Sequence, residues 1–126
     1  MTKTIINTTE APAPIGPYNQ AIMVNNMLFI SGQIPMDAAT GQIVTGNIAD
    51  ETHQSMKNLQ AILKEAGLNF TNVVKTTIFL SDMALFAQVN KAYGSYFTSD
   101  YPARETVAVK GLPQNVNVEI SMIAAS

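Results

Sequence analysis

The sequence predicts an α+β domain in which two helices cover one face of a six-stranded mixed sheet. The apolar patterns follow the order strand, strand, strand, helix, strand, helix, strand, strand. Two helices of ordinary length are too few to cover both faces of such a sheet, so the other face must meet water or another subunit. At 126 residues the chain is long enough for one core and too short for two, so we expect a single domain spanning residues 1–126.

The first third of the chain predicts three strands separated by loops. A short strand is expected at residues 3–6, and a loop rich in proline follows at residues 9–21. Residues 21–34 contain two apolar runs separated by Asn25 and Asn26. Because asparagine tolerates a positive φ, this pair predicts the turn of a hairpin. Residues 36–46 form a second, glycine-containing loop.

The middle of the chain predicts a helix, a strand and a second helix. Asn47 can cap the first helix, whose apolar residues recur at helical spacing. Gly67 can adopt the left-handed conformation that commonly ends a helix. Residues 72–81 are β-branched and aromatic, which is typical of a strand. Asp82 can cap the second helix. Its expected apolar stripe comprises Phe86, Val89, Tyr93, Tyr96 and Phe97.

Residues 101–123 predict two further strands joined by a short turn, and each of them carries a charge. Alternation places Arg104 with Thr106 on one face of the first strand, and Glu119 with Ser121 on one face of the second. We expect all four side chains on the sheet face that the helices leave uncovered. On this hypothesis the two charges lie at a subunit boundary and not in the core.

Composition excludes several classes of function. The chain has no cysteine and a single histidine, so a cysteine-ligated metal or a site of several imidazoles cannot form within one subunit, and we expect no metal and no cofactor. The net charge is −2 and there is no basic run, so no nucleic-acid partner is expected. No apolar stretch is long enough to span a membrane, and the first residues lack a signal-peptide pattern. We therefore expect a cytoplasmic protein without a membrane partner.

The charged fraction favours an oligomer. Charged residues make up 13% of the chain, about half of the usual share of roughly 25%. A surface rich in uncharged polar residues is the simpler explanation. The alternative, which we favour, is that identical partners cover much of the surface.

Arg104 and Glu119 are the main candidates for chemistry. A guanidinium binds a carboxylate through two parallel hydrogen bonds, although an arginine at a strand end can also pair with a structural acid. A carboxylate in the middle of a strand is costly unless it is paired, hydrogen-bonded or hydrated. Glu119 is therefore either an acid–base group that handles water or half of a salt bridge, for instance to Arg104.

Four other residues are weaker candidates when they are read from spacing alone. Tyr18 follows a Gly-Pro turn and could cover a pocket or simply anchor the loop. Ser31 and Gly32 end a strand, where backbone N–H groups can face an anion. Asn90 borders the apolar stripe of the second helix, a position that usually faces solvent. His53 is expected to be exposed on the first helix and receives no role.

The segment "YPARETVAVKGLPQNVNVEISMI" resembles the C-terminal signature of the RidA family, also called YjgF or L-PSP. The signature residues are Pro102-Ala103-Arg104, Val107, Leu112 and Val118-Glu119-Ile120. The similarity continues through "APAPIGPYNQA", "LFISGQIP", "QSMKNLQAILKEAG" and "VVKTTIFLSDM" in the expected order. It therefore covers nearly the whole chain.

The resemblance implies a chorismate-mutase-like fold and a homotrimer with a pocket in each of the three clefts between subunits. It also implies cofactor-independent hydrolysis of reactive 2-imino acids, such as 2-iminobutanoate and 2-iminopropanoate, to 2-oxo acids and ammonia. Within this family pattern Arg104 holds the substrate carboxylate and Glu119 handles water. The remaining positions of the pattern that bind substrate are Tyr18, Ser31, Gly32, Asn90 and Thr106.

Two departures from the family pattern concern the site. Many members carry cysteine where this chain has Thr106, which can still donate a hydrogen bond but excludes thiol chemistry. Glu105 replaces a residue that is usually small, and alternation predicts that it faces away from Arg104. Two other functions remain open: a regulatory trimer that binds a small carboxylate without turnover, and the ribonuclease activity reported for family members, which the net charge does not favour.

Overall fold

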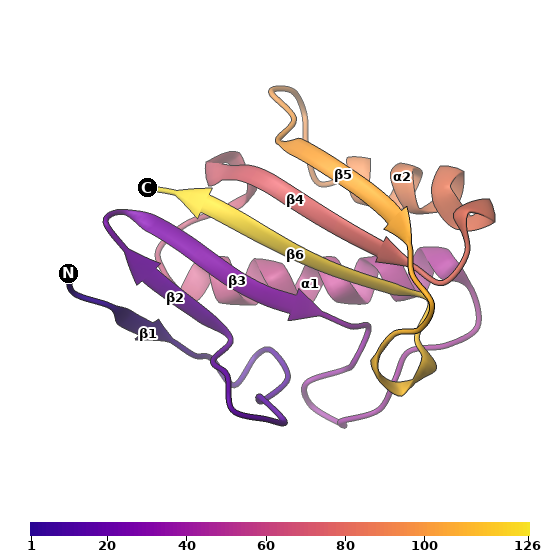
Figure 1. The fold of residues 1–126 in the computed structure, drawn as a ribbon, viewed down its shortest axis with the longest axis horizontal. Coiled ribbons are helices and arrows are strands. Elements are labelled where there is room, and N and C mark those ends of the chain that lie inside the picture. The colour runs from indigo at the N-terminus through magenta and orange to yellow at the C-terminus, as the bar shows by residue number, and fades with distance from the viewer.

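The computed structural model describes all 126 residues and contains one six-stranded sheet with two α-helices. The strands are β1 (Thr4–Ile6), β2 (Ala21–Val24), β3 (Met27–Gln33), β4 (Val73–Leu80), β5 (Ala103–Ala108) and β6 (Val118–Ala125). The helices are α1 (Ile48–Glu65) and α2 (Phe86–Gly94), and both lie behind the sheet on the same side in Figure 1. The predicted α+β architecture is thus confirmed. Neither helix combines the length and the apolar composition that a membrane span requires.

The strand order across the sheet is β1-β2-β3-β6-β4-β5. All neighbouring pairs are antiparallel except β4 and β5, which are parallel. The prediction that residues 101–123 form two strands joined by a short turn is therefore only half right. The two strands exist, but β4 lies between them, because β6 inserts in the centre of the sheet while β5 adds to its edge (Figure 1).

Local chemistry explains where the elements begin and end. Asn47 caps α1, since its side chain accepts a hydrogen bond from the Asp50 N–H at 2.8 Å. Asn25 and Asn26 adopt positive φ values in the hairpin between β2 and β3, as their sequence predicted. Asp82 caps a short 3-10 turn that leads into α2, and α2 ends at Gly94. The apolar stripe expected for α2 therefore extends past the helix, into the turn that holds Tyr96 and Phe97.

A single apolar core lies between the helices and one face of the sheet. The side chains that are fully buried on the helix side include Met56, Leu59, Ile62 and Leu63 of α1 and Ile78, Leu80, Val118 and Ile120 of the central strands. Burying each such side chain contributes about 1.5–3 kcal/mol. The opposite face has no helix over it, so its side chains are partly or largely exposed, as the sequence predicted.

Candidate functional site

Arg104 lies on the face of the sheet that the helices cover. In the parallel pair of β4 and β5 it is opposite Thr76, a fully buried residue. The expectation that Arg104 and Thr106 lie on the uncovered face is therefore wrong. Alternation groups them correctly, but it does not say which face the group occupies. That is decided by the register with β4, whose buried residues point at the helices.

Three residues of α2 hold the Arg104 guanidinium. Asn90 Oδ1 accepts a hydrogen bond of 2.6 Å from Arg104 Nη2. The guanidinium carbon lies 5.1 Å from the ring centroid of Tyr93 and 5.7 Å from that of Phe86, within the range of cation–π attraction. Within the chain, Arg104 therefore contacts the Asn90 amide and the rings of Tyr93 and Phe86. It does not pair with a structural acid, which was the alternative expectation. Nor is Asn90 a solvent-facing helix residue.

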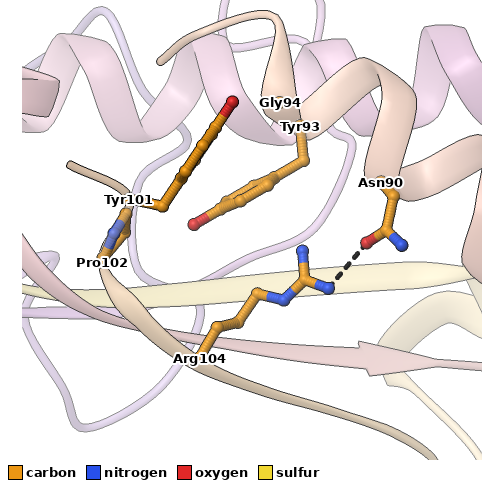
Figure 2. Close-up of a pocket in the computed structure, with 6 residues that line it drawn as sticks. All are labelled: Asn90, Tyr93, Gly94, Tyr101, Pro102 and Arg104. Atoms are coloured by element: carbon orange, nitrogen blue, oxygen red, sulfur yellow. Dashed lines mark hydrogen bonds between the residues drawn. The ribbon is translucent and has the colours of Figure 1, made fainter. Parts of the chain in front are cut away.

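The guanidinium faces a cavity of about 330 Å³ (Figure 2). The cavity is lined by Asn90, Tyr93, Gly94, Tyr101, Pro102 and Arg104. The Tyr93 hydroxyl donates a hydrogen bond of 2.9 Å to Thr76 Oγ1, which fixes the ring. Burial raises the pKa of Tyr93, so its ring serves as a neutral platform. A guanidinium has five N–H donors, and Asn90 accepts from only one of its nitrogens, so Arg104 can still bind an anion.

Thr106 follows Arg104 on the same face and is paired with Ile78. Its hydroxyl oxygen is buried and has no hydrogen-bond partner. Most buried polar side-chain atoms in proteins are paired, so an unpaired hydroxyl next to a candidate site is notable. Thr106 therefore offers a second donor on the strand that carries Arg104.

Glu119 lies on the opposite, uncovered face of the sheet. Its neighbours in β6, Val118 and Ile120, are fully buried under the helices, so alternation points Glu119 away from them. This part of the prediction is confirmed. Burial raises the pKa of Glu119. Arg104 and Glu119 thus lie on different faces, and no salt bridge joins them within one chain.

Gly32 lies beside Glu119, and Ser31 precedes Gly32 in β3. A side-chain Cβ at Gly32 would lie 2.8 Å from Glu119 Cδ, so the carboxyl group rests on the bare backbone of β3. Gly32 and Tyr18 line one small hollow of about 40 Å³. Tyr18 is 48% exposed, so it does not anchor its loop by burying its ring. The Ser31 hydroxyl donates to the Asn19 carbonyl at 2.7 Å, which leaves its oxygen to accept.

The seven predicted residues therefore form two groups and not one. Arg104, Asn90 and Thr106 form the first group, on the helix side near the β5 edge, and of these three Arg104 and Asn90 line the cavity. Glu119, Gly32, Ser31 and Tyr18 form the second group, in which Glu119 contacts Gly32 on the uncovered face and Tyr18 shares a hollow with Gly32. Sequence reasoning missed the parts played by Phe86 and Tyr93. Their spacing with Asn90, at i, i+4 and i+7, is the signal that could have shown one helix face turned toward Arg104.

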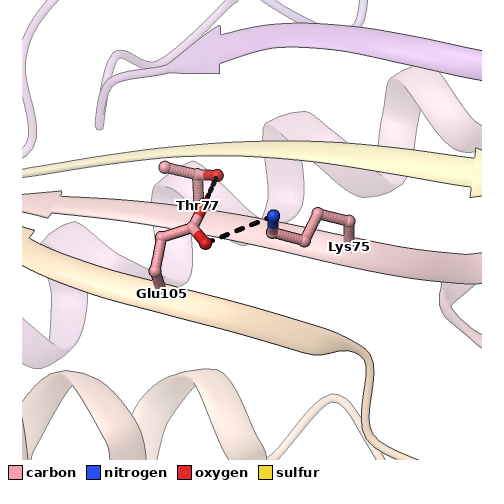
Figure 3. Close-up of polar contacts among 3 residues, drawn as sticks. All are labelled: Lys75, Thr77 and Glu105. Carbon is pink, nitrogen blue, oxygen red and sulfur yellow. Dashed lines mark hydrogen bonds and ion pairs between the residues drawn. The ribbon is translucent and has the colours of Figure 1, made fainter.

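Glu105 lies on the uncovered face, away from Arg104, as alternation predicted. Its carboxylate accepts a hydrogen bond of 2.8 Å from the Thr77 hydroxyl and pairs with Lys75 Nζ at 3.2 Å (Figure 3). The Thr77 hydrogen bond and the Lys75 ammonium lower the pKa of Glu105. Glu105 therefore does not repel an anion at Arg104 of the same chain.

His53 is half-buried and not exposed as expected, since its Nδ1 lies 2.9 Å from the Tyr96 hydroxyl. No group of three or more histidine, aspartate or glutamate side chains is arranged to hold a metal ion.

Comparison with known proteins identifies the family and the fold. Residues 8–126 match the family model described as Endoribonuclease L-PSP. The human 2-iminobutanoate/2-iminopropanoate deaminase is 48% identical, over 95% of this chain and 88% of its own length. The crystal structure of the Rid-family protein YyfA from Yersinia pestis superposes with a TM-score of 0.97 at 44% identity, covering 99% of this chain and 100% of that one. The crystal structure of E. coli TdcF with bound serine superposes with a TM-score of 0.93 at 39% identity, over 98% of each chain.

Proposed function

This chain belongs to the RidA/YjgF (L-PSP) family, and we propose that it hydrolyses reactive 2-imino acids to 2-oxo acids and ammonia. The relatives named as 2-iminobutanoate/2-iminopropanoate deaminases match nearly its whole length, so those two imino acids are the proposed substrates. The observation that carries the proposal is the Arg104 guanidinium. Asn90 holds it in place, and it faces a cavity with hydrogen-bond donors to spare.

The substrate carboxylate would lie on the free N–H groups of Arg104, with the unpaired Thr106 hydroxyl as a further donor. This contact fixes C2 and its imine nitrogen in one orientation. Positioning of this kind is an efficient source of rate acceleration. Because imines already hydrolyse in water, the site needs only modest additional chemistry.

Glu119 would handle the water in this mechanism. A water molecule attacks C2 of the protonated imine, and Glu119 takes a proton from that water as the C–O bond forms. The electron pair of the C=N bond moves to nitrogen, which then receives the proton from Glu119. Collapse of the intermediate breaks the C–N bond and forms the C2 carbonyl, while Glu119 carries the proton of the C2 hydroxyl to the departing ammonia, which leaves as ammonium. The balance is one water consumed for each 2-oxo acid and ammonium formed.

One chain alone cannot bring Arg104 and Glu119 to the same substrate, because the sheet separates them. We therefore place the complete site between subunits, with the Arg104 group of one chain facing the Glu119 group of the next. The two groups are different surfaces, so this contact is heterologous, and a heterologous contact that closes forms a ring. The family resemblance implies that this ring is a homotrimer.

The uncovered face supports a subunit contact. One row of side chains across β1, β2, β3 and β6 is apolar, and it consists of Ile5, Ile22, Phe29 and Ile123. Ile5 is 54% exposed and Phe29 is 44% exposed in the single chain. A row of partly exposed apolar side chains of this kind suits a protein interface. It adjoins the Glu119 group, so the same contact would bury the row and complete the site.

Subunit mixing tests the proposal. Arg104→Ala and Glu119→Gln are each expected to be inactive alone on imines generated in place by an amino-acid oxidase. After subunit exchange, an equal mixture pairs an intact Arg104 with an intact Glu119 at about a quarter of the interfaces, one half times one half. Activity should therefore return to about that fraction of the wild-type rate. If the mixture did not recover activity although mass measurements showed subunit exchange, Arg104 and Glu119 would not complete one site across a subunit contact.

The serine in the E. coli relative keeps a second function open: a trimer that binds a small carboxylate as a signal. The residues would be the same, with Arg104 as the anion-binding group. Turnover distinguishes the two functions. Binding of a 2-oxo acid without any acceleration of imine hydrolysis by the pure protein would favour the regulatory function.

A further inference from the structure

A second groove lies where the start of α1 meets α2 and the segment before β6. It has a volume of about 520 Å³. Its lining includes five amide side chains, those of Asn47, Gln88, Gln114, Asn115 and Asn117, and one charged side chain, that of Glu51. It shares no lining residue with the Arg104 cavity. Neither the predicted site nor the proposed mechanism uses it.

Glu51 is the unusual feature of this groove. It is only 6% exposed, yet no lysine, arginine or histidine forms an ion pair with it, since the ion pair of this chain is Lys75 with Glu105. Its carboxylate receives hydrogen bonds from one side chain, that of Asn117. A buried carboxylate is costly unless it is paired and fully hydrogen-bonded. Glu51 therefore has unused capacity for a cation, and it faces a groove large enough to hold one.

The Asn117 contact decides which cation fits. Asn117 Nδ2 lies 3.3 Å from Glu51 Oε1 and 3.2 Å from Oε2, so it occupies the position between the two carboxylate oxygens. A guanidinium would need that position for its two parallel hydrogen bonds. The Asn117 amide cannot simply turn over, because its Oδ1 accepts a hydrogen bond of 2.8 Å from the Ser81 hydroxyl. Only the outer lone pairs of the carboxylate remain free.

A primary ammonium suits this arrangement. It is compact and has three N–H donors, which one carboxylate oxygen and two amide carbonyls can accept. A divalent metal ion would need about six oxygen ligands, usually with more than one carboxylate. The apolar part of the groove wall comprises Ile43, Ile48, Leu85 and Val116. An alkyl group attached to the ammonium would pack against that wall.

We propose that this groove binds a small primary alkylammonium, with the charge on Glu51 and the alkyl group on the apolar wall. The site is separate from the imine-hydrolysing site and does not rest on the proposed activity. The test is a titration of the isotope-labelled full-length protein with n-propylammonium chloride, followed by the NMR signals of the Asn117 side-chain NH₂. We expect a saturable shift. Tetramethylammonium has no N–H donors and guanidinium requires the occupied position, so neither should reproduce it.

Two matched variants complete the test. Glu51→Gln keeps the shape and removes the charge, and it should weaken n-propylammonium binding by about tenfold or more, as expected for a charge-assisted contact. Glu65→Gln makes the same change at an exposed position of the same helix and should have no effect. An equal response to tetramethylammonium, or unchanged binding in Glu51→Gln, would overturn the proposal. Loss of subunit assembly in Glu51→Gln, together with no ammonium binding to wild type, would also overturn it. That result would show that a cationic side chain of a second copy fills the groove.

Discussion

The carboxyl group of Glu119 rests directly on Gly32. A Cβ atom at position 32 would lie 2.8 Å from Glu119 Cδ, closer than real Cβ atoms approach, and 3.0 Å from Glu119 Oε2. The neighbouring strands β3 and β6 shift register between Ile30 and Gln33, at the point where Gly32 lies. The absence of a side chain at Gly32 therefore sets where the Glu119 carboxylate can be.

Gly32→Ala should displace the Glu119 carboxylate and leave the fold intact. A displacement of about 1 Å can cost on the order of a hundredfold in rate, so we expect kcat for imine hydrolysis to fall by roughly tenfold to a hundredfold. Gly111→Ala is the matched control, because a Cβ there meets nothing within 4 Å. Steady-state rates of both variants, with thermal unfolding to check the fold, test this. Wild-type kcat in Gly32→Ala would show that the position of Glu119 is unimportant.

Glu119→Gln should affect turnover far more than binding. A base that acts in the transition state lowers kcat when it is lost and leaves ground-state affinity largely unchanged. General acid–base groups contribute about 10²–10⁴-fold, and we expect a loss toward the low end because imines are labile. Calorimetric titration with a 2-oxo acid should give an affinity similar to that of wild type. If kcat persisted while 2-oxo acid binding was lost, the role of Glu119 would be to hold Arg104 of the neighbouring subunit in place and not to take a proton from water.

The pH dependence of kcat should report the raised pKa of Glu119, which burial causes. Glu119 accepts a proton in the mechanism, so it must be ionised. Because its pKa is raised, activity should fall on acidification at a higher pH than an ordinary glutamate would give. Rates over the weakly acidic range, corrected for uncatalysed imine hydrolysis, test this. A profile with no acidic limb above the ordinary glutamate pKa would argue against Glu119 as the base.

Arg104→Lys should be nearly as poor as Arg104→Ala. The lysine keeps the charge, but it cannot form both the hydrogen bond to Asn90 and two parallel bonds to a carboxylate. Each charge-assisted hydrogen bond contributes roughly 1.5–3 kcal/mol, so we expect kcat/KM to fall by at least about tenfold. Kinetics of the two variants on the same imine make the comparison. Near wild-type turnover in the lysine variant would mean that Arg104 acts only as a diffuse positive charge.

Phe29→Glu should weaken the proposed trimer. Phe29 is 44% exposed on the uncovered face, so a charge there costs little in the single chain but is buried without a partner in the assembly. Light scattering at micromolar concentration should show a trimer for wild type and smaller species for the variant, with imine hydrolysis lost together with assembly. Lys64→Glu, at an exposed position of α1, is the control. A monomeric wild type would remove the basis for a site between subunits.

Much of the fold could be predicted from local sequence patterns. Asn47 and Gly67 bracket α1 because capping depends on a few neighbouring residues, and Asn25 with Asn26 marks the hairpin because positive φ is a property of single residues. Alternation in β6 correctly separated Glu119 from Val118 and Ile120, since the period of a strand is local. Residue type and spacing already marked Arg104 and Glu119 as candidates, and the family resemblance added their expected roles.

Long-range pairing decided the rest. The period of two in β5 grouped Arg104 with Thr106, but only the parallel register with β4 shows that this group faces α2. Likewise, nothing local indicates that β6 inserts between β3 and β4, or that Asn90 holds the guanidinium from a helix 14 residues away. A strand has the same local pattern whichever face its charges occupy. The sequence alone therefore determined which residues share a face, and the tertiary structure decided that Arg104 and Glu119 lie on opposite faces, because register is set by the packing of the whole sheet.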